Sequence, residues 1–399
     1  MKLKQVDTFL FKVIYLVMFG IIVTQVLNLD SLTSLLFLTT FPLTVLLWLR
    51  SVRKTVTETD VIMILTAAMA VVGVLLNAGA ANADLSFQYL KKLIMFVMTL
   101  LYFQTAYRVR IHGELADFIN KLVDLLTLFL LVMYLARPTA MHTIGGRVSM
   151  YLTFRFTNPN MTAMFLVSVY MLKMHRLFTR EKWYVKFWHC AMLAVLLWFV
   201  VETQSRNALL VLVMYTVLSL WLFFRGRKQM YISKGWAALF SLFPAFLVGA
   251  YMTLVNSRWI QKLLSFLISE GKQLDSRVKI WKPALENLWQ SPLFGAYYEI
   301  SHGTGESQMH NSHMDIAASY GIVVLLLVCV LLIRYLHQDG RRYADKSRFI
   351  YILGFAGMVV LGMGEAAVFS GGLGIYILAG TFLLLANQET DGDGGQTGS

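Results

Sequence analysis

Polar side chains that can bind anions or move protons gather at four places in an otherwise apolar sequence. These places are residues 147–160, 202–207, 275–282 and 310–315. Arginine presents a planar guanidinium that binds anions, and histidine exchanges its proton near neutral pH. Because segments that are remote in sequence can converge in a folded bundle, the four clusters are candidates for a single chemical site.

Arg206 and Arg277 are the candidate anion-binding residues. Arg206 lies at the start of an apolar run, where an arginine is costly in lipid but can face a wet cavity. The alternatives for Arg206 are a local ion pair with Glu202, four residues earlier, or a side chain that extends to the membrane interface. The alternative for Arg277 is a solvated loop charge.

His310 precedes a long apolar run and is the candidate residue for proton transfer. If the helix already begins there, His310, Met314 and Gly321 fall on one stripe, because that spacing makes about three helical turns. His313 would then share the same face. The alternative is that both histidines are amphipathic side chains at the membrane interface.

The elements that must position these residues are membrane helices. Apolar residues make up 57% of the chain and charged residues 14%, whereas soluble domains are about a quarter charged. The apolar residues form blocks of the length that crosses a bilayer as a helix, so we expect an all-α, polytopic bundle of about twelve helices. The expected spans are residues 9–27, 35–49, 61–77, 92–107, 115–135, 159–174, 187–202, 208–224, 236–255, 314–333, 348–366 and 371–386.

The net charge of +13 follows from membrane topology and does not predict nucleic-acid binding. Most basic residues lie in every second connection between the expected spans. Under the positive-inside rule, connections rich in basic residues are cytoplasmic. The cytoplasmic clusters are near residues 2–12, 50–54, 108–110, 173–186, 225–234 and 334–348. Both termini are therefore expected in the cytoplasm.

Two extracytoplasmic connections, residues 136–158 and 256–313, are longer than the rest and are expected to carry function. In the second, Val278, Trp281 and Trp289 recur at helical spacing, which predicts a helix at the membrane interface or one packed on the bundle. We expect one transmembrane domain over residues 1–386, including this loop. Residues 387–399 are expected to form a disordered cytoplasmic tail.

No cofactor or metal is expected from the sequence. Extracytoplasmic carboxylates with the spacing of metal ligands are absent from the sequence, so the prediction for metal is none. Cys190 and Cys329 fall in or beside apolar spans, where a thiol behaves as a small hydrophobic group. They indicate no disulfide framework.

Four motifs in a fixed order resemble the O-antigen ligase and polymerase family of bacterial membranes. They are Phe156-Thr157-Asn158-Pro159-Asn160, Thr203-Gln204-Ser205-Arg206, the stretch from Asp275-Ser276-Arg277 to Ser291-Pro292-Leu293-Phe294-Gly295, and His310-Asn311 followed by Gly321. The resemblance covers residues 145–335. The family scaffold also has many helices and one large late periplasmic loop, similar to the GT-C type of membrane glycosyltransferase.

The resemblance implies transfer of a glycan from an undecaprenyl diphosphate carrier to an acceptor hydroxyl outside the bacterial cytoplasmic membrane. It implies that His310 is the catalytic general base and that Arg206 and Arg277 bind the diphosphate, with inversion at the anomeric carbon. The partners would be the lipid-linked donor, a glycan or glycolipid acceptor and the bilayer. Supporting positions would be His313, Asn311, Arg147, Arg155, Asn158 and Asn160.

Two questions stay open at the level of sequence. The first is whether the acceptor is another carrier-linked glycan, as in a polymerase, or a terminal glycolipid, as in a ligase. Ile322-Val323-Val324 follows Gly321 where the family often has further glycines or threonines, which favours a polymerase. The second is whether the chain is instead a glycolipid flippase or exporter, which would place polar groups at the membrane midplane on broken helices.

Overall fold

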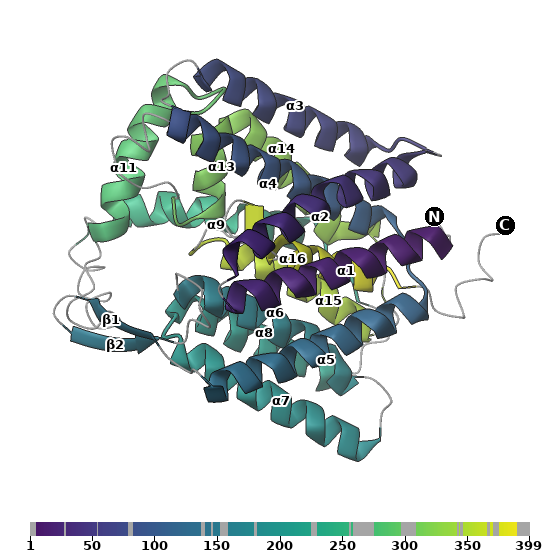
Figure 1. Cartoon of the computed structure of the whole chain (residues 1–399). Helices are drawn as coiled ribbons and strands as arrows, with labels where there is room; N and C mark the ends of the chain where they lie inside the picture. The colour runs from purple at the N-terminus through teal and green to yellow at the C-terminus, as the bar shows by residue number, and fades with distance from the viewer. Residues whose placement is uncertain are drawn as a thin grey trace.

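The computed structural model describes residues 5–27, 29–53, 55–78, 83–136, 140–144, 147–151, 159–178, 182–224, 230–254, 257, 275–296, 309–340, 343, 346–364, 368–369 and 375–388. The secondary-structure elements of the described residues are helices, apart from one β-hairpin (Figure 1). The elements are α1 (Gln5–Val26), α2 (Asp30–Val52), α3 (Glu58–Ala78), α4 (Ala83–Arg108), α5 (Gly113–Ala136), β1 (Ala140–Ile144), β2 (Arg147–Tyr151), α6 (Pro159–Met174), η1 (His175–Phe178), α7 (Trp183–Glu202), α8 (Arg206–Phe224), α9 (Lys234–Leu254), α11 (Asp275–Gln290), α13 (Ser312–Tyr320), α14 (Ile322–His337), η2 (Gln338–Gly340), α15 (Lys346–Leu361) and α16 (Ile375–Ala386).

Among the described helices, six are long and apolar enough to cross a membrane. They cover residues 7–24, 30–52, 58–77, 113–136, 183–202 and 234–253. The apolar helices over residues 206–222, 322–337, 348–361 and 375–386 are shorter. The fold class is therefore helical and membrane-spanning as expected, whereas the total of twelve spans stays a prediction.

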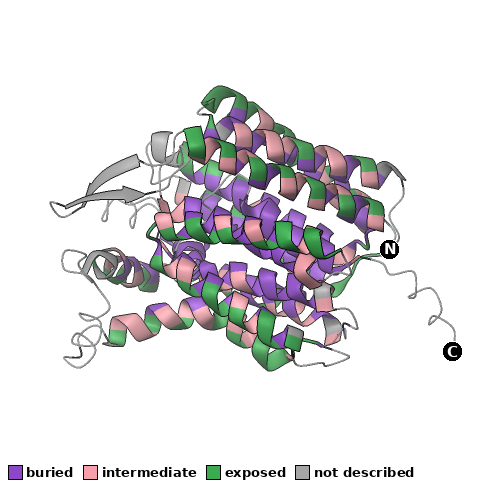
Figure 2. Cartoon of the chain, turned by 90° about the horizontal axis from the view of Figure 1, so that it is seen from below, coloured by how far each residue is buried: buried purple, intermediate pink, exposed green. Residues whose placement is uncertain are grey.

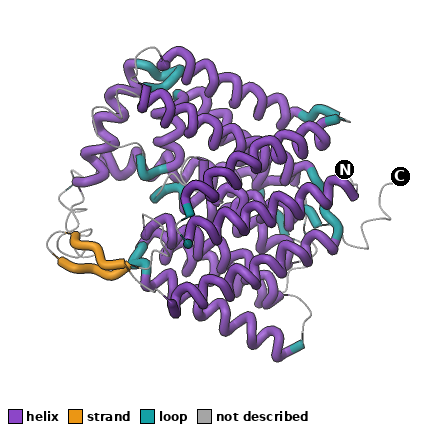
Figure 3. Tube along the Cα trace, in the orientation of Figure 1, coloured by secondary structure: helices purple, strands orange, loops and turns teal. Residues whose placement is uncertain are grey.

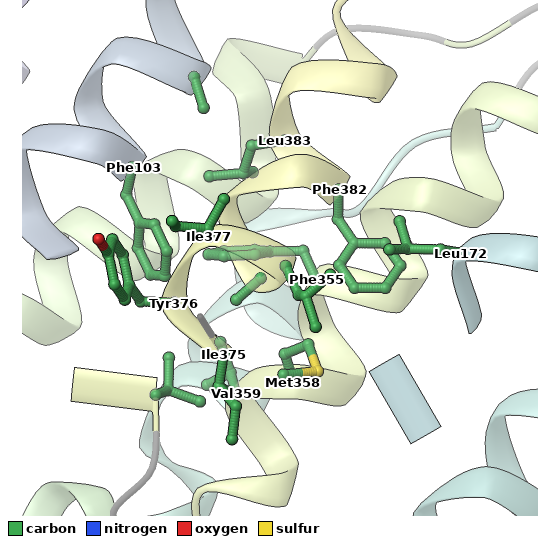
Figure 4. Close-up of a cluster of buried hydrophobic side chains, with 14 of the residues drawn as sticks. Phe103, Leu172, Phe355, Met358, Val359, Ile375, Tyr376, Ile377, Phe382 and Leu383 are labelled. Atoms are coloured by element: carbon green, nitrogen blue, oxygen red, sulfur yellow. The ribbon is translucent and has the colours of Figure 1, made fainter. Parts of the chain in front are cut away.

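The core of the bundle is built around α16, which is buried along its whole length. Phe103 of α4 and Phe355 of α15 pack beside it, and Phe382 projects from it into the same cluster (Figure 4). Gly380 lets a neighbour come close, because a Cβ there would meet the Tyr102 ring at 2.5 Å. Small residues at helix contacts allow this close approach of helices in membranes.

The outer helices expose apolar side chains on the faces that point away from the bundle (Figure 2). Leu38, Leu75 and Phe246 are each more than 60% exposed. Exposed apolar faces of this kind are compatible with the hydrocarbon core of a bilayer, which offers no hydrogen-bond partners.

Ion pairs gather at one end of the bundle, which we call the basic end. There Asp7 pairs with Arg50, Asp60 with Arg108 and Glu58 with Arg334. The hairpin and α11 lie at the opposite end (Figures 1 and 3). The basic end therefore carries several of the clusters that the sequence assigned to the cytoplasm.

Two details differ from the sequence prediction. The hairpin β1–β2, with Ala140 paired to Tyr151 and Ile144 to Arg147, was not expected. The predicted span over residues 314–333 is not one helix, because it breaks at Gly321 into α13 and α14.

Candidate functional site

Asn311 fixes the start of α13. Its side-chain oxygen accepts hydrogen bonds from the backbone N–H groups of His313 and Met314, each at 3.0 Å. Its side-chain nitrogen donates to the carbonyl of Pro244 in α9 at 3.0 Å and to that of Met363 after α15 at 3.2 Å. An asparagine at this position is a favourable helix cap. Because Asn311 is fully buried and uses both ends of its amide, it joins three elements at the site.

The side chain of His313 is buried and makes a structural hydrogen bond. Its Nε2 lies 2.6 Å from the carbonyl oxygen of Ser241, so Nε2 carries the proton and donates it to this bond. Its Nδ1 is buried without a hydrogen-bond partner among the described residues. A neutral imidazole with no exposed nitrogen cannot accept a proton from a substrate hydroxyl, which argues against direct chemistry by His313.

His310 lies before α13 and not on it. Helix α13 begins at Ser312, and His310 has a backbone φ of 48°, in the left-handed region. The expected stripe of His310, Met314 and Gly321 is therefore wrong, and His313 does not share a helix face with His310. The side chain of His310 is half-buried, whereas the residues on both sides of it are buried. The chain thus presents one partly accessible imidazole between two fixed segments.

Arg206 is the first residue of α8, and its side chain is exposed. The next residue, Asn207, donates from its side chain to the carbonyl of Leu361 at 3.2 Å. The backbone N–H of Ser312 donates to the carbonyl of Gly362 in the same turn at 2.7 Å. The turn over residues 361–364 is therefore contacted by the start of α8 on one side and the start of α13 on the other. This brings the segments of Arg206 and His310, more than a hundred residues apart in sequence, to one place.

Helix α11 carries Arg277, whose backbone is helical and whose side chain lies outside the described residues. One turn later, Trp281 is 1% exposed and its indole N–H donates to the carbonyl of Met309 at 2.7 Å. Trp281 also contacts the ring of Tyr251 in α9, with centroids 5.5 Å apart. Of the two interpretations of this helix, packing on the bundle holds for the Trp281 face, while Trp289 at its end is 74% exposed.

A loop after α11 fills the break between α13 and α14. The carbonyl of Pro292 accepts from the N–H of Ile322 at 2.8 Å, and the N–H of Ala296 donates to the carbonyl of Ala318 at 2.9 Å. Gly321 has a φ of 93°, and a Cβ there would lie 2.1 Å from the carbonyl oxygen of Leu293. Only glycine fits this close backbone contact. The motif residues near 292–295 and 321 therefore act together as one packing unit.

The remaining candidates lie earlier in the chain, and two of them lie outside the described residues. Arg147 belongs to β2, and its side chain is not among those described. Asn160 is half-buried in the first turn of α6. Arg155 and Asn158 lie outside the described residues.

One pair was missed by the sequence analysis. Lys92 in α4 and Asp315 in α13 form an ion pair of 2.8 Å, with side chains 7% and 2% exposed. Asp315 also accepts a hydrogen bond from the N–H of Met309 at 3.2 Å, directly before His310. A lysine within an apolar span is a signal of function or of a buried partner, and Lys92 could have been found on that ground.

These observations define a class of protein: a helical membrane protein with a polar site where the starts of α8 and α13 contact the turn after α15, and where α11 packs on α13. Residues 191–329 match the family model described as O-antigen ligase. The matched residues include Arg206, Arg277 and His310. No curated protein matches the chain. The match indicates an enzyme that ligates or polymerises surface glycans from lipid-linked substrates.

Proposed function

We propose that this protein transfers an undecaprenyl-diphosphate-linked oligosaccharide to an acceptor hydroxyl on the extracytoplasmic face of a bacterial inner membrane. The observation that carries the proposal is the meeting of Arg206 and His310 segments at the turn over residues 361–364, inside the region that matches the family. Under the positive-inside rule, the basic end is cytoplasmic and this site faces outward.

In the proposed reaction, His310 accepts the proton of the acceptor hydroxyl as its oxygen attacks the anomeric carbon. The bond from that carbon to the diphosphate oxygen breaks, and the undecaprenyl diphosphate leaves with the electron pair. Attack from the side opposite the leaving group inverts the anomeric carbon. A general base in this position contributes a factor of about 10² to 10⁴ to the rate.

Arg206 and Arg277 would bind the departing diphosphate through charge-assisted hydrogen bonds. Arg206 is well suited to this, because the start of α8 also offers the positive end of a helix dipole. Trp281 in the same helix as Arg277 donates a hydrogen bond to Met309, the residue before His310. Helix α11, which carries Arg277, is therefore held next to His310. We propose that this charge neutralisation operates without a metal ion.

An apolar groove supports binding of the prenyl tail. Two adjoining cavities of about 440 and 460 Å³ lie between α8, α9 and α15 and share Leu218, Trp221, Phe240 and Leu353. Trp221 is 48% exposed, so the groove opens toward the surrounding lipid. The groove begins at Val211, roughly 8 Å along α8 from Arg206 at the usual helical rise. A lipid in this groove would place its headgroup toward Arg206.

The test is transfer by the purified protein in lipid nanodiscs supplied with a defined undecaprenyl diphosphate oligosaccharide. We expect a longer or acceptor-linked glycan together with released undecaprenyl diphosphate. His310→Ala should lower the rate by about 10² to 10⁴ with the protein level preserved. His313→Ala should have a smaller effect. Wild-type turnover by the His310 variant, or the reverse ranking of the two, would contradict the proposal.

A flippase remains the second candidate because of two observations. The helix pair α13 and α14 is broken at Gly321, and the ion pair of Lys92 and Asp315 is buried beside the break, as in many transporters. The two candidates differ in a liposome assay. A flippase would move a fluorescent prenyl diphosphate glycan between leaflets and leave it intact, whereas the transferase would release the carrier from the glycan.

A further inference from the structure

The conformation of His310 depends on the residues that flank it. A left-handed backbone is unfavourable for any residue with a Cβ, and it persists only where the surrounding structure holds it. His310 is one of three non-glycine residues with positive φ among those described. Its side chain can point in a defined direction only if the backbone on both sides is fixed.

On the C-terminal side, Asn311 provides this restraint through its four hydrogen bonds. On the N-terminal side, both backbone groups of Met309 are bound by side chains. The N–H of Met309 donates to a carboxylate oxygen of Asp315 at 3.2 Å, and its carbonyl accepts from the Trp281 indole at 2.7 Å. The Met309 side chain is 1% exposed in a small apolar cluster with Trp281 and Met314.

Lys92 compensates the charge of this acceptor. Its ammonium lies 2.8 Å from the carboxylate of Asp315, whose side chain is 2% exposed. Such a buried pair adds little to stability compared with apolar residues of the same volume. Its contact with the backbone next to His310 indicates another role.

We propose that Asp315 and Trp281 are positioning residues that fix Met309 and thereby orient the His310 imidazole toward the acceptor hydroxyl, while Lys92 compensates the charge of the buried Asp315. Trp281 lies one turn after Arg277, so the same contact sets the spacing between α11 and the base. The inference rests on the proposed function for its catalytic consequence. Its conformational content stands on the contacts alone.

Two double variants test the role of the acceptor for Met309. Lys92→Met with Asp315→Leu removes the ion pair and the acceptor, whereas Lys92→Met with Asp315→Asn removes the same charges and keeps an amide oxygen for the Met309 N–H. We expect the Leu variant to lose kcat by about 10²-fold, as for a misplaced catalytic group, with the donor KM unchanged. The Asn variant should retain most of the wild-type kcat. Equal kcat in the two double variants, at equal protein abundance, would overturn the proposal.

A milder variant covers the case in which the Leu double variant does not fold. Trp281→Phe keeps an aromatic ring in the apolar cluster and removes only the indole N–H. We expect it to lower kcat and leave the donor KM unchanged. Trp289→Phe is the matched control, because Trp289 lies on the same helix with its side chain 74% exposed, and its activity should equal that of the wild type. Wild-type kcat in Trp281→Phe would overturn the role of the indole.

A readout without turnover separates this inference from the proposed function. His310→Cys in a background with Cys190→Ser and Cys329→Ala is labelled with a membrane-impermeant maleimide, with and without each double variant. We expect the Leu variant to change the labelling rate several-fold and the Asn variant to leave it close to that of the parent. An unchanged rate in the Leu variant would refute the positioning role. Changed labelling together with an absence of transferase activity in the wild-type protein would instead refute the proposed function alone.

Discussion

Gly321→Ala is the substitution whose effect follows most directly from the structure. The backbone φ of 93° at this residue is unfavourable for alanine, at a cost of about 1–3 kcal/mol. The new Cβ would lie 2.1 Å from the Leu293 carbonyl oxygen and 2.8 Å from the Phe294 nitrogen, so the backbone loop must move. Forcing a methyl group into a packed region costs about 1–3 kcal/mol more. The expected destabilisation is therefore about 2–6 kcal/mol.

The assay is thermal unfolding of the purified protein in detergent, compared with Gly249→Ala. Gly249 lies within α9, and a Cβ there would meet no atom within 4 Å. Alanine is favoured over glycine in a helix by about 1 kcal/mol, so this control should be as stable as the wild type or more so. The same Gly321 variant should lose the hydrogen bond from Ile322 to Pro292 and shift α13, so glycan transfer should fall as well.

The reasoning would be refuted if Gly321→Ala unfolded at the wild-type temperature and kept full activity. That result would mean that the chain between Pro292 and Phe294 can yield at little cost. A loss of activity in Gly249→Ala of the same size would also refute it, because the effect would then reflect any change of glycine in the bundle and not the close contact.

Three further predictions concern the charges, the topology and the acceptor. Arg206→Lys and Arg277→Lys should each lose most activity because lysine lacks the planar fork, and chelator should leave the wild type active; activity that vanishes with EDTA and returns with magnesium would point to a metal. Single cysteines at positions 53 and 227 should resist an impermeant reagent applied to intact cells, whereas one at position 300 should react; the opposite pattern would invert the topology. Deletion of the gene should leave single repeat units on the acceptor, as expected for a polymerase, while long chains retained on undecaprenyl diphosphate would identify a ligase.

Most of the helices could be predicted because each apolar run is bounded by charges or loops. The break at Gly321 could not, since the apolar run continues through Ile322 and the contact that creates the break comes from Pro292, far back in the sequence. The start of α13 was readable in principle, because Asn311 followed by Ser312 is a typical helix cap. Applying that signal would have placed His310 outside the helix.

The hairpin and the buried pair also left signals that are weaker than hydropathy. A Gly-Gly pair separates Ile144 from Arg147, and such a pair between two short runs is typical of a two-residue hairpin turn. The partnership of Lys92 with Asp315 joins residues from α4 and α13, and a single sequence holds no information about which distant charge compensates a buried one. The candidate residues Arg206 and His310 were identified by type and motif, while the meeting of their segments at the turn over residues 361–364 required the fold.

That turn has a consequence for how substrates of different size can be accommodated. A Cβ at Gly362 would lie 2.7 Å from the Ser312 hydroxyl, and one at Gly364 would lie 2.1 Å from the Asn207 amide nitrogen. The glycines thus let α8 and α13 close on the turn from either side, and the separation of the two helix starts is set by a backbone only four residues long. Under the proposed function, the glycan would be recognised by other segments. A related chain could then change the sugar it handles by altering its long outer loop and keep the arrangement of these two helix starts.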